Sequence, residues 1–561
     1  EMLRSLVGSE MCIRDRLCSM SACDYEAVNT NPYGVSDGEL GPLKYGARFM
    51  NMQQRVIPIG SPSLTTGPGN DLQNTDLISS GNYIGYFGNN NNWGFNNEAN
   101  WNFTDSRMNY AYQNFYSQIF LPWNEIYEIA KDSDSPSEQA ILEIANIVRN
   151  IAWLRATDVF GPIAYNSAGD GSIAPKFDSQ EVVYRSMLAD LSKSVELLNT
   201  ISYSVMAQYD LIYNGNVQNW VKLANSLMLR IAVRVHFIDE TLAKEYITKA
   251  LDPKNGGVIE DISSEAKIKS SDKMPLLNSM LASVNEYNET RMGATIWGYL
   301  DGYKDPRLSA YFTEGTYGSG SWAQTGYFPV APTNSKSKSE TSYSAKFASR
   351  PKVDSNSPLY WFRASETYFL KAEAALYNLI GGDPKTFYEQ GINISFQEQG
   401  VSGVATYLSG TGKPTGLTGS NYKYGTYNHD LSIGNTSPKW DDYTGNLSKQ
   451  EEQLQKIITQ KYLALYPNAV EAWTEYRRTG FPYLMKPMDE AAPGRIGASI
   501  EDCRVPERFR FAPTAYNSNP NMAEIPTLLG GGDIGATKLW WVRSNRPKQP
   551  CLLYTSDAAD E

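Results

Sequence analysis

The sequence of 561 residues has few of the residues that most often carry catalysis or bind metals. Only two histidines occur, His236 and His429, and only five cysteines. Histidine is the usual acid–base catalyst near neutral pH and a common zinc ligand, so histidine catalysis and multi-histidine metal sites are disfavoured. The scarcity of cysteine argues against a disulfide framework. We therefore expect no cofactor, and leave open whether a structural ion is bound.

Known catalytic signatures are also missing. The chain has no H-E-x-x-H zinc motif and no G-x-S-x-G nucleophile elbow. Residues 410–415 superficially resemble a phosphate-binding loop, but Tyr407 stands where the first glycine belongs, and Pro414 replaces the Ser or Thr after the lysine. Neighbouring acids such as Asp441 and Asp442 do not establish the facing carboxylate pair of a glycoside hydrolase. We therefore expect a binding protein, with a glycoside hydrolase as a remote alternative.

Long apolar runs and excess positive charge are absent as well. No apolar stretch reaches the roughly 18 residues that predict a membrane-spanning helix. The formal net charge is −11 at pH 7. A moderately acidic chain is a poor candidate for nonspecific binding to phosphates, so we expect no nucleic-acid partner.

Both ends of the chain resemble translated adapter DNA. Reverse translation of residues 11–16 gives a string whose reverse complement encodes Cys-Leu-Leu-Tyr-Thr-Ser, the sequence of residues 551–556. One element in opposite orientations explains both, and it resembles the transposon end used to prepare sequencing libraries. We interpret residues 1–16 and 551–561 as adapter-derived, which leaves the native sequence before Leu17 and after Pro550 unknown. Without these segments the formal charge changes from −11 to −8.

A lipoprotein-type cysteine follows the first of these segments. The Met-Ser-Ala-Cys sequence that ends at Cys23 resembles the lipobox of bacterial lipoproteins. Residues 17–22 are then the remnant of a signal peptide, and residues 23–550 form a single domain. The polar sequence after Cys23 suits a tether, and two or more acyl chains anchor a protein stably. An ordinary buried cysteine is the alternative.

Helix signals recur along the rest of the chain. Capping boxes begin at Ser135, Asp178 and Ser448. Apolar residues at helical spacing follow each of them. Helices are predicted over residues 135–159, 178–198, 220–235, 240–251, 365–379, 384–394, 448–465 and 468–477.

The predicted helices occur in pairs, with small residues such as Ala372 and Ala375 at the expected contacts. Such pairs suggest degenerate tetratricopeptide-like hairpins, although no fixed period is visible. Between them lie segments rich in Gly, Asn, Ser and Tyr, over residues 51–109, 270–351 and 401–438. Segments of this length are usually functional or have structure of their own. An elaborated surface is the alternative.

Two regions interleave aromatic and polar residues. Residues 82–103 read NYIGYFGNNNNWGFNNEANWNF, and residues 297–327 include TYGSGSWAQTGYF. Aromatic rings pack against the C–H faces of sugars, and amides form hydrogen bonds with sugar hydroxyls. We therefore expect at least one ring in these regions to contact a glycan, with core packing as the alternative for any single ring.

Several segments, in order, match one family. Residues 220–230 resemble the W-x-K-x-A-N-S-L-x-L-R helix of the SusD/RagB family of outer-membrane nutrient-binding lipoproteins. The matches together cover nearly all of residues 23–541. Motif positions such as Asn225, Ser226 and Arg477 are expected to be structural, with their polar groups satisfied by helix packing. The other matching segments are DVFGPI at 158–163, DPR at 305–307, SETYFLKAEA at 365–374, QKYLAL at 460–465, EAW at 471–473 and YRRTGFP at 476–482.

The resemblance implies a mainly α, SusD-like fold, with about four tetratricopeptide-like helix pairs and long, irregular, loop-rich lobes. Family members are not enzymes. They capture oligosaccharides and deliver them to a SusC-like TonB-dependent outer-membrane transporter; in the RagB branch the ligand is a peptide or another nutrient, which stays the alternative here. The resemblance places the lipid anchor at Cys23, in the outer membrane facing the cell exterior. The candidate glycan-binding residues are Trp93, Trp101, Asn102, Trp297, Tyr299, Trp322 and Tyr327.

Overall fold

The computed structural model describes residues 43–61, 66–89, 104–332, 347–418, 428–486 and 505–549. The chain divides into two units, Glu1–Lys44 and Tyr45–Glu561. The first contributes only Leu43 and Lys44 to the described residues, so the account that follows concerns the second. Within the described ranges, no helix has the length and apolar character needed to cross a bilayer.

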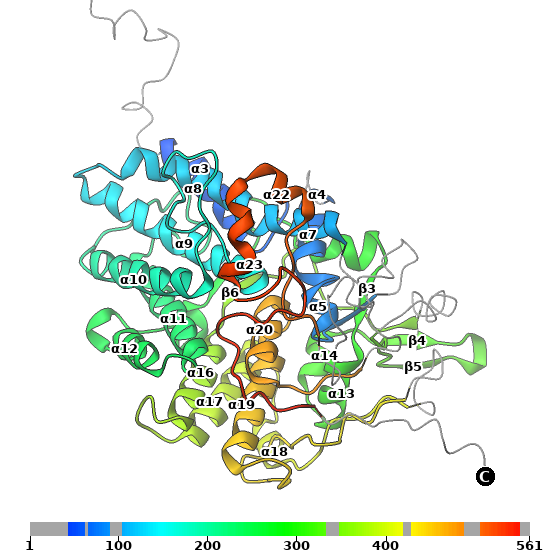
Figure 1. The fold of residues 1–561 in the computed structure, drawn as a ribbon. Helices are drawn as coiled ribbons and strands as arrows, with labels where there is room; N and C mark the ends of the chain where they lie inside the picture. The colour runs from blue at the N-terminus through cyan, green and yellow to red at the C-terminus, as the bar shows by residue number, and fades with distance from the viewer. Residues whose placement is uncertain are drawn as a thin grey trace, which may run out of the picture. The chain divides into compact units, whose positions relative to one another are not determined.

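Helices make up most of the second unit (Figure 1). The mainly α class predicted from the sequence is therefore confirmed. The α-helices are α3 (Leu43–Val56), α4 (Thr66–Leu72), α5 (Ser80–Tyr83), α7 (Asp105–Tyr112), α8 (Gln118–Ala130), α9 (Pro136–Phe160), α10 (Gln180–Leu198), α11 (Val217–Val235), α12 (Glu240–Leu251), α13 (Ala294–Gly302), α14 (Arg307–Tyr311), α16 (Ala364–Leu376), α17 (Pro384–Glu398), α18 (Val404–Ser409), α19 (Lys449–Leu465), α20 (Ala469–Thr479), α22 (Pro513–Ser518) and α23 (Ile525–Leu528). Shorter π and 3-10 turns are η1 (Gln73–Leu77), η2 (Gln113–Ser117), η3 (Pro253–Asn255), η4 (Ile262–Ser264), η5 (Ala282–Glu286), η6 (Gly320–Trp322) and η8 (Pro520–Glu524).

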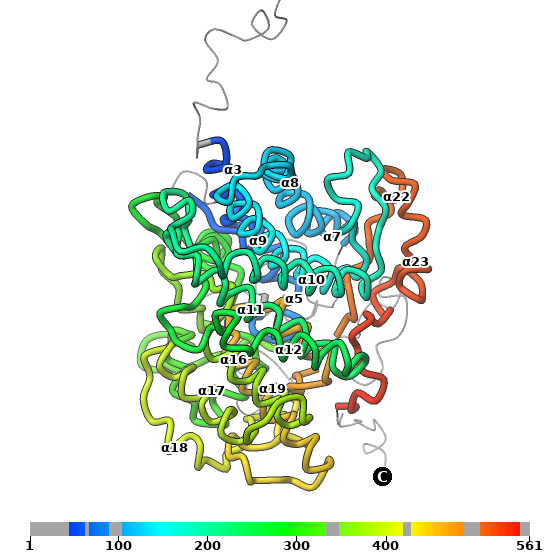
Figure 2. Tube along the Cα trace, turned by 90° about the vertical axis from the view of Figure 1, so that its left-hand side faces the viewer, coloured from blue at the N-terminus to red at the C-terminus, as the bar shows by residue number. Residues whose placement is uncertain are grey.

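The long helices pack one on the next. Contacts run from α8 through α9, α10 and α11 to α12, and α16 packs on α11, α17 and α19. Figure 2 shows these helices stacked one beside the next, in an order that follows the colours from blue to yellow. The predicted hairpin of α16 and α17 is confirmed, since the two helices pack against each other. The closer comparison with tetratricopeptide repeats stays a prediction.

Helix caps agree with the sequence at α19 and differ at α10. Ser448 caps α19, since its side-chain oxygen accepts a hydrogen bond from the Glu451 N–H at 3.2 Å. At α10 the cap is Ser179, which accepts from the Val182 N–H. The predicted cap, Asp178, instead accepts from two backbone N–H groups of the preceding loop.

The segment over residues 51–109 contains helices that the sequence analysis did not predict. In α3 the buried side chains of Tyr45, Phe49, Met52 and Val56 lie at helical spacing. Polar residues further along form hydrogen bonds with their own helices, for example between Asn74 Nδ2 and the carbonyl four residues earlier. These Gln- and Asn-rich turns therefore form helices despite their loop-like composition.

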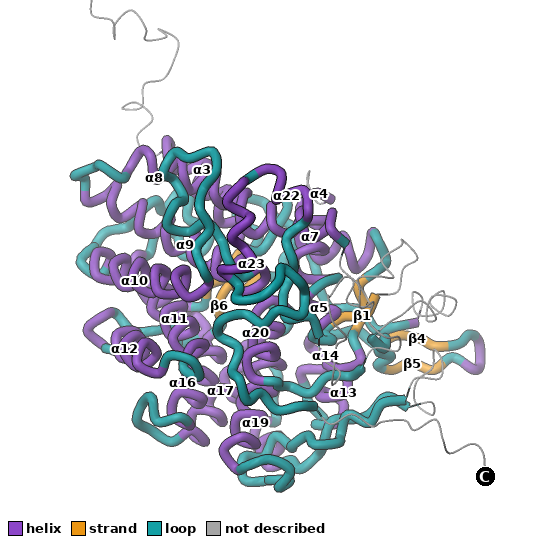
Figure 3. Tube along the Cα trace, in the orientation of Figure 1, coloured by secondary structure: helices purple, strands orange, loops and turns teal. Residues whose placement is uncertain are grey.

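Three short antiparallel pairs of strands occur in the described part of the chain (Figure 3). None extends beyond two strands, so each depends on side chains packed against it from elsewhere in the chain. Pair β1 (Phe87–Asn89) and β3 (Thr290–Met292) joins Phe87 to Met292; β2 (Ala266–Ile268) and β6 (Leu359–Phe362) are bulged after Ala266; β4 (Gly315–Tyr317) and β5 (Gln324–Gly326) form a hairpin.

A buried network of charges joins three of the scaffold helices. Arg234 of α11 has no exposed side-chain surface, and it donates hydrogen bonds to Asp158 of α9 at 2.5 Å and to Glu471 of α20. Burial raises the pKa of Asp158 to about 6, although Arg234 opposes this shift. The arginines beside Glu471 hold the pKa of its carboxyl well below its ordinary value. The network therefore holds charged side chains in the core by pairing them.

The same network extends to α16. Arg230 forms a bidentate pair with Glu366, with both distances 2.7 Å, and Arg478 forms another with Glu373 at 2.6 and 2.7 Å. His236 Nε2 also lies 2.9 Å from Glu373. Arg230, Glu366, Glu373 and Arg478 belong to the matching segments, and their burial in ion pairs fits the structural role predicted for such positions.

Candidate functional site

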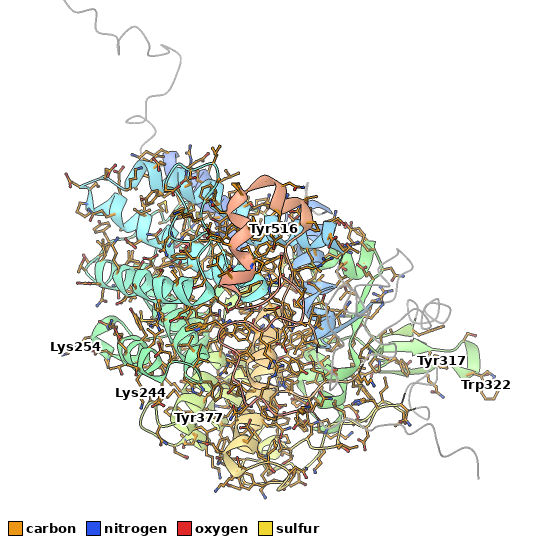
Figure 4. The ribbon with its side chains drawn as sticks, in the orientation of Figure 1. Lys244, Lys254, Tyr317, Trp322, Tyr377 and Tyr516 are labelled. Carbon is orange, nitrogen blue, oxygen red and sulfur yellow. The ribbon has the colours of Figure 1, made fainter. Side chains whose placement is uncertain are left out.

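The β4–β5 hairpin carries the most exposed aromatic ring in the described part of the chain. Trp322 is 85% exposed, and Tyr203 is the other large aromatic side chain on the exposed surface of those residues. Figure 4 shows Trp322 at the tip of the hairpin, with Tyr317 nearer its base. An indole in full contact with water costs free energy that an apolar ligand surface recovers on binding.

Glycine conformations create the hairpin tip. Gly318 and Gly320 have φ angles of +84° and +58°, values that side chains rarely permit. A Cβ atom on Gly318 would lie 2.9 Å from the Trp322 carbonyl oxygen. The turn η6 then closes through a hydrogen bond from the Trp322 N–H to the Ser319 carbonyl at 3.3 Å. The backbone around Trp322 is therefore fixed locally, while its ring stays in solvent.

The base of the hairpin rests on other aromatic side chains. Tyr317 packs against Phe328 and Phe347, with ring centroids 6.3 and 5.7 Å away. Tyr327 is half-buried against the core beside them. Residues 315–330 include no acidic or basic side chain. The hairpin therefore offers an uncharged aromatic surface, suited to a neutral ligand with apolar faces.

The structure places Trp297 and Tyr299 differently from the sequence analysis. Both lie on α13, where Trp297 is only 8% exposed and Tyr299 is fully buried. The Tyr299 hydroxyl lies 2.9 Å from both Asn435 Oδ1 and the Tyr483 carbonyl oxygen. Neither ring presents a face to solvent, so the ligand role predicted for these two residues does not fit the structure.

Four other predicted residues lie outside the described part of the chain. They are the anchor residue Cys23 and the candidates Trp93, Trp101 and Asn102. Those roles stay predictions. The hairpin residues Trp322 and Tyr327 are thus the predicted residues whose positions suit a ligand-binding surface.

The histidines and cavities offer no arrangement typical of catalysis. Burial lowers the pKa of His429 to about 4 and lowers that of His236 from its ordinary value. The cavities of about 160 and 490 Å³ have no carboxylate in their linings. Two smaller cavities do, Asp76 in one and Asp158 with Glu471 in the other, and all three carboxylates are paired with arginines. Within the described ranges, no group of three or more His, Cys, Asp or Glu side chains is arranged to hold a metal. These cavities therefore lack the two free, facing carboxylates that a glycoside hydrolase uses.

Comparison with known proteins identifies the family. A family model described as SusD-like, "Susd and RagB outer membrane lipoprotein", matches residues 27–542. The chain belongs to the SusD-like family. As a SusD-like protein it is a binding protein rather than an enzyme, and its family is one of outer-membrane lipoproteins.

Solved SusD homologues share the whole fold. The SusD homologue from Bacteroides uniformis is 30% identical, with a TM-score of 0.77, and the match covers 89% of this chain and 99% of that one. One from Bacteroides vulgatus is 28% identical, with a TM-score of 0.79 and coverage of 90% and 99%. A chitin-binding SusD homologue from Flavobacterium johnsoniae is also 28% identical, with a TM-score of 0.78 and coverage of 90% and 100%. Among curated protein sequences, none matches the chain.

Proposed function

We propose that this SusD-like protein captures oligosaccharides at the cell surface and delivers them to a TonB-dependent outer-membrane transporter. The observation that carries the proposal is the exposed indole of Trp322 on an uncharged hairpin. Sugar rings have apolar faces that stack on such an indole, and neutral glycans need no charged partner. Similarity to a chitin-binding homologue over nearly the whole chain supports the same ligand class.

The exposed platform fits weak, transient capture. One aromatic stacking contact contributes about 0.5–1.5 kcal/mol beyond the area it buries. A shallow surface of a few such contacts corresponds to a dissociation constant between about 1 μM and 1 mM, or about −8 to −4 kcal/mol. A protein that passes its ligand to a transporter benefits from rapid release.

The membrane location and the partner belong to the proposal as well. Cys23 carries the lipid in this account, and the acyl chains hold the protein in the outer membrane, facing the cell exterior. The description of the family as outer-membrane lipoproteins supports this arrangement. The transporter is of the SusC-like, TonB-dependent class.

Affinity electrophoresis tests the glycan-binding proposal. The protein, beginning after Cys23, migrates through native gels that contain glycol chitin, soluble starch or arabinoxylan. We expect at least one polysaccharide to retard the wild type, and Trp322→Ala to lose much of that retardation. Leu121→Ala is the matched control, because Leu121 is also a highly exposed apolar residue but lies on α8. Equal retardation of Trp322→Ala and the wild type would remove the hairpin from the site.

One observation favours the peptide alternative. The cavity of about 160 Å³ is lined by Arg363 and Lys352, together with three tyrosines. However, Arg363 already lies 3.8 Å from Glu398 and over the Tyr360 ring at 3.5 Å. An existing ion pair and stacked ring leave this arginine less available to a peptide carboxylate. Binding of a tryptic peptide mixture, with no retardation by any polysaccharide, would support the alternative.

A further inference from the structure

An uncharged trough lies away from the hairpin, at the junction of α10 and α11. It has a volume of about 490 Å³ and is formed by two short segments, residues 199–204 and 214–218. Its lining contains amides and hydroxyls but no acidic or basic side chain. Lys273, which is outside the lining, donates to Asn214 Oδ1 at 2.6 Å.

The walls of the trough are held in place by the loop behind them. The Val205 N–H donates to the Gly215 carbonyl at 3.1 Å and joins the two segments. The buried carboxylate of Asp210 accepts from the Gly215 N–H at 2.8 Å and from Trp220 Nε1 at 2.9 Å. Gly215 has a φ of +82°, and a Cβ there would lie 2.7 Å from Ala207. The shape of the trough is therefore built into the fold.

Tyr203 supplies an aromatic surface within this trough. It is 45% exposed. Among the described residues, Tyr203 and Trp322 are the two large aromatic side chains that are exposed. The side chains of Asn216 and Gln218 are exposed on the facing segment. A ring beside amides and hydroxyls offers stacking for a sugar face and hydrogen bonds for its hydroxyls.

We propose that this trough is a second contact site for neutral oligosaccharide chains. The proposal rests on the proposed glycan-binding function and adds a site to it. Asn199 at the trough donates to the Lys254 carbonyl at 2.8 Å. Figure 4 shows Lys254 and Trp322 on opposite sides of the molecule. A single polysaccharide chain that is long enough to reach from one side of the molecule to the other can contact both sites, whereas a short oligosaccharide occupies one.

Two linked contacts give a dependence on ligand length. Once one site holds a polymer, the second binds at the high effective concentration set by the connecting chain. Loss of the weaker site then reduces retention of the polymer more than binding of a short fragment. Stacking on one ring corresponds to a factor of about tenfold or less in affinity.

The test compares Tyr203→Ala, Trp322→Ala and the double variant with the wild type. Gels containing glycol chitin, soluble starch or arabinoxylan report polymer binding, and calorimetry with chitohexaose, maltohexaose or xylohexaose reports fragment binding. We expect Tyr203→Ala to weaken polymer binding by about threefold to tenfold and to leave fragment affinity within about twofold. Tyr203→Phe keeps the ring and should stay close to the wild type.

The outcomes separate the two proposals. If the double variant loses the residual polymer binding of Trp322→Ala, the trough is the second site. If Tyr203→Ala matches the wild type on every polymer that Trp322→Ala fails to bind, the second site is overturned and the proposed function stands. If no polymer retards the wild type, the proposed function fails, and the second site fails with it.

Discussion

Arg234 and Arg185 show that an arginine contributes differently to the stability of the fold in the core and at the surface. Arg234 is fully buried between Asp158 and Glu471, while Arg185 is 44% exposed and pairs with Glu181 and Asp239 at the surface. Water screens the surface pairs, so their contribution is small. Removal of Arg234 deprives two buried carboxylates of the counter-charge closest to them, which is costly.

We therefore expect Arg234→Met to lower the free energy of unfolding by about 3–5 kcal/mol. Arg185→Met, the matched control, should cost about 1 kcal/mol or less. Urea denaturation followed by circular dichroism gives both values. Similar losses for the two variants would show that the buried network is not a main source of stability.

Lys456 predicts a dependence of stability on pH. Its amine is buried in α19 and donates to the Ser437 carbonyl at 2.8 Å, and burial lowers its pKa from 10.5 to about 8. Between these values the unfolded chain binds more protons than the folded one, so the stability contributed by Lys456 rises with pH. Below pH 8 the folded state carries the buried charge.

Lys456→Met removes this titration. The melting temperature of the variant, relative to the wild type, should be highest below pH 8 and should fall as the pH rises toward 10.5. Thermal melts of both proteins between pH 7 and 10 measure the difference. A difference that stays constant over this range would contradict the shifted pKa.

At the scale of elements, shortening the β4–β5 hairpin allows the binding role of its tip to be tested without disturbing the rest of the fold. Tyr317 and Gln324 are directly paired across β4 and β5. Replacement of residues 318–323 by Asn-Gly joins these partners through a two-residue turn of the type that favours hairpins. The shortened protein lacks Trp322 but keeps the aromatic base.

We expect this variant to retain its melting temperature within about 2 °C, since the deleted tip is exposed, and surface changes usually alter stability by less than about 0.5 kcal/mol. Its retardation by polysaccharide should fall as in Trp322→Ala. Differential scanning fluorimetry and affinity electrophoresis measure the two properties. Full retardation with the tip removed would place the glycan elsewhere.

Local sequence signals predicted many helices but not every boundary. The predicted 384–394 helix runs to Glu398 as α17, whereas the predicted 365–379 helix ends at Leu376 as α16. Asn378, with a φ of +55°, ends the helical path there. At α9 the predicted cap Ser135 makes no side-chain cap, and the Ser133 hydroxyl instead donates to Glu138. Which residue caps a helix depends on the other polar groups nearby that compete for the same hydrogen bonds, and a capping pattern in the sequence does not show which of them prevails.

At the scale of the molecule, long-range packing decided which aromatic residues reach the surface. Gly298 and Gly302 of α13 lie under a distant loop: the Thr415 N–H donates to the Gly298 carbonyl at 2.7 Å, and a Cβ on Gly302 would lie 2.1 Å from the Lys413 carbonyl. This loop is more than a hundred residues away in sequence, so local reasoning placed Tyr299 in a surface site when it is core. The aromatic composition did single out Trp322, which is exposed, and its ligand role stays a prediction.

Tyr203 went unnoticed for the same reason. Its neighbours are serines, and only the pairing of Val205 with Gly215 turns this stretch into one wall of a trough. The family segments were more informative, because they contain most residues of the buried network, although Arg234 lies outside them. They also contain Asn225, whose amide donates to the carbonyls of Asn255 and Gly257 at 2.6 and 2.9 Å.

The proposed anchor gives a prediction for the whole protein. With a lipoprotein leader ahead of Cys23, the protein expressed in a Bacteroides host should sediment with outer membranes, and Cys23→Ala should move it to the soluble fraction because no acyl chain is attached. Cys503→Ala serves as the control for loss of a thiol. Membrane association of Cys23→Ala equal to that of the wild type would contradict lipid attachment at this residue.

The central claim, glycan capture on exposed tryptophan, is tested most directly by fluorine NMR. The 12 tryptophans are labelled with 5-fluorotryptophan, Trp322→Phe assigns the hairpin resonance, and the oligosaccharide is the hexamer of whichever polysaccharide retards the wild type. We predict that the Trp322 resonance shifts in a saturable way, while those of buried residues such as Trp220 and Trp473 stay in place. An unchanged Trp322 resonance at a hexamer concentration that saturates binding would contradict the account.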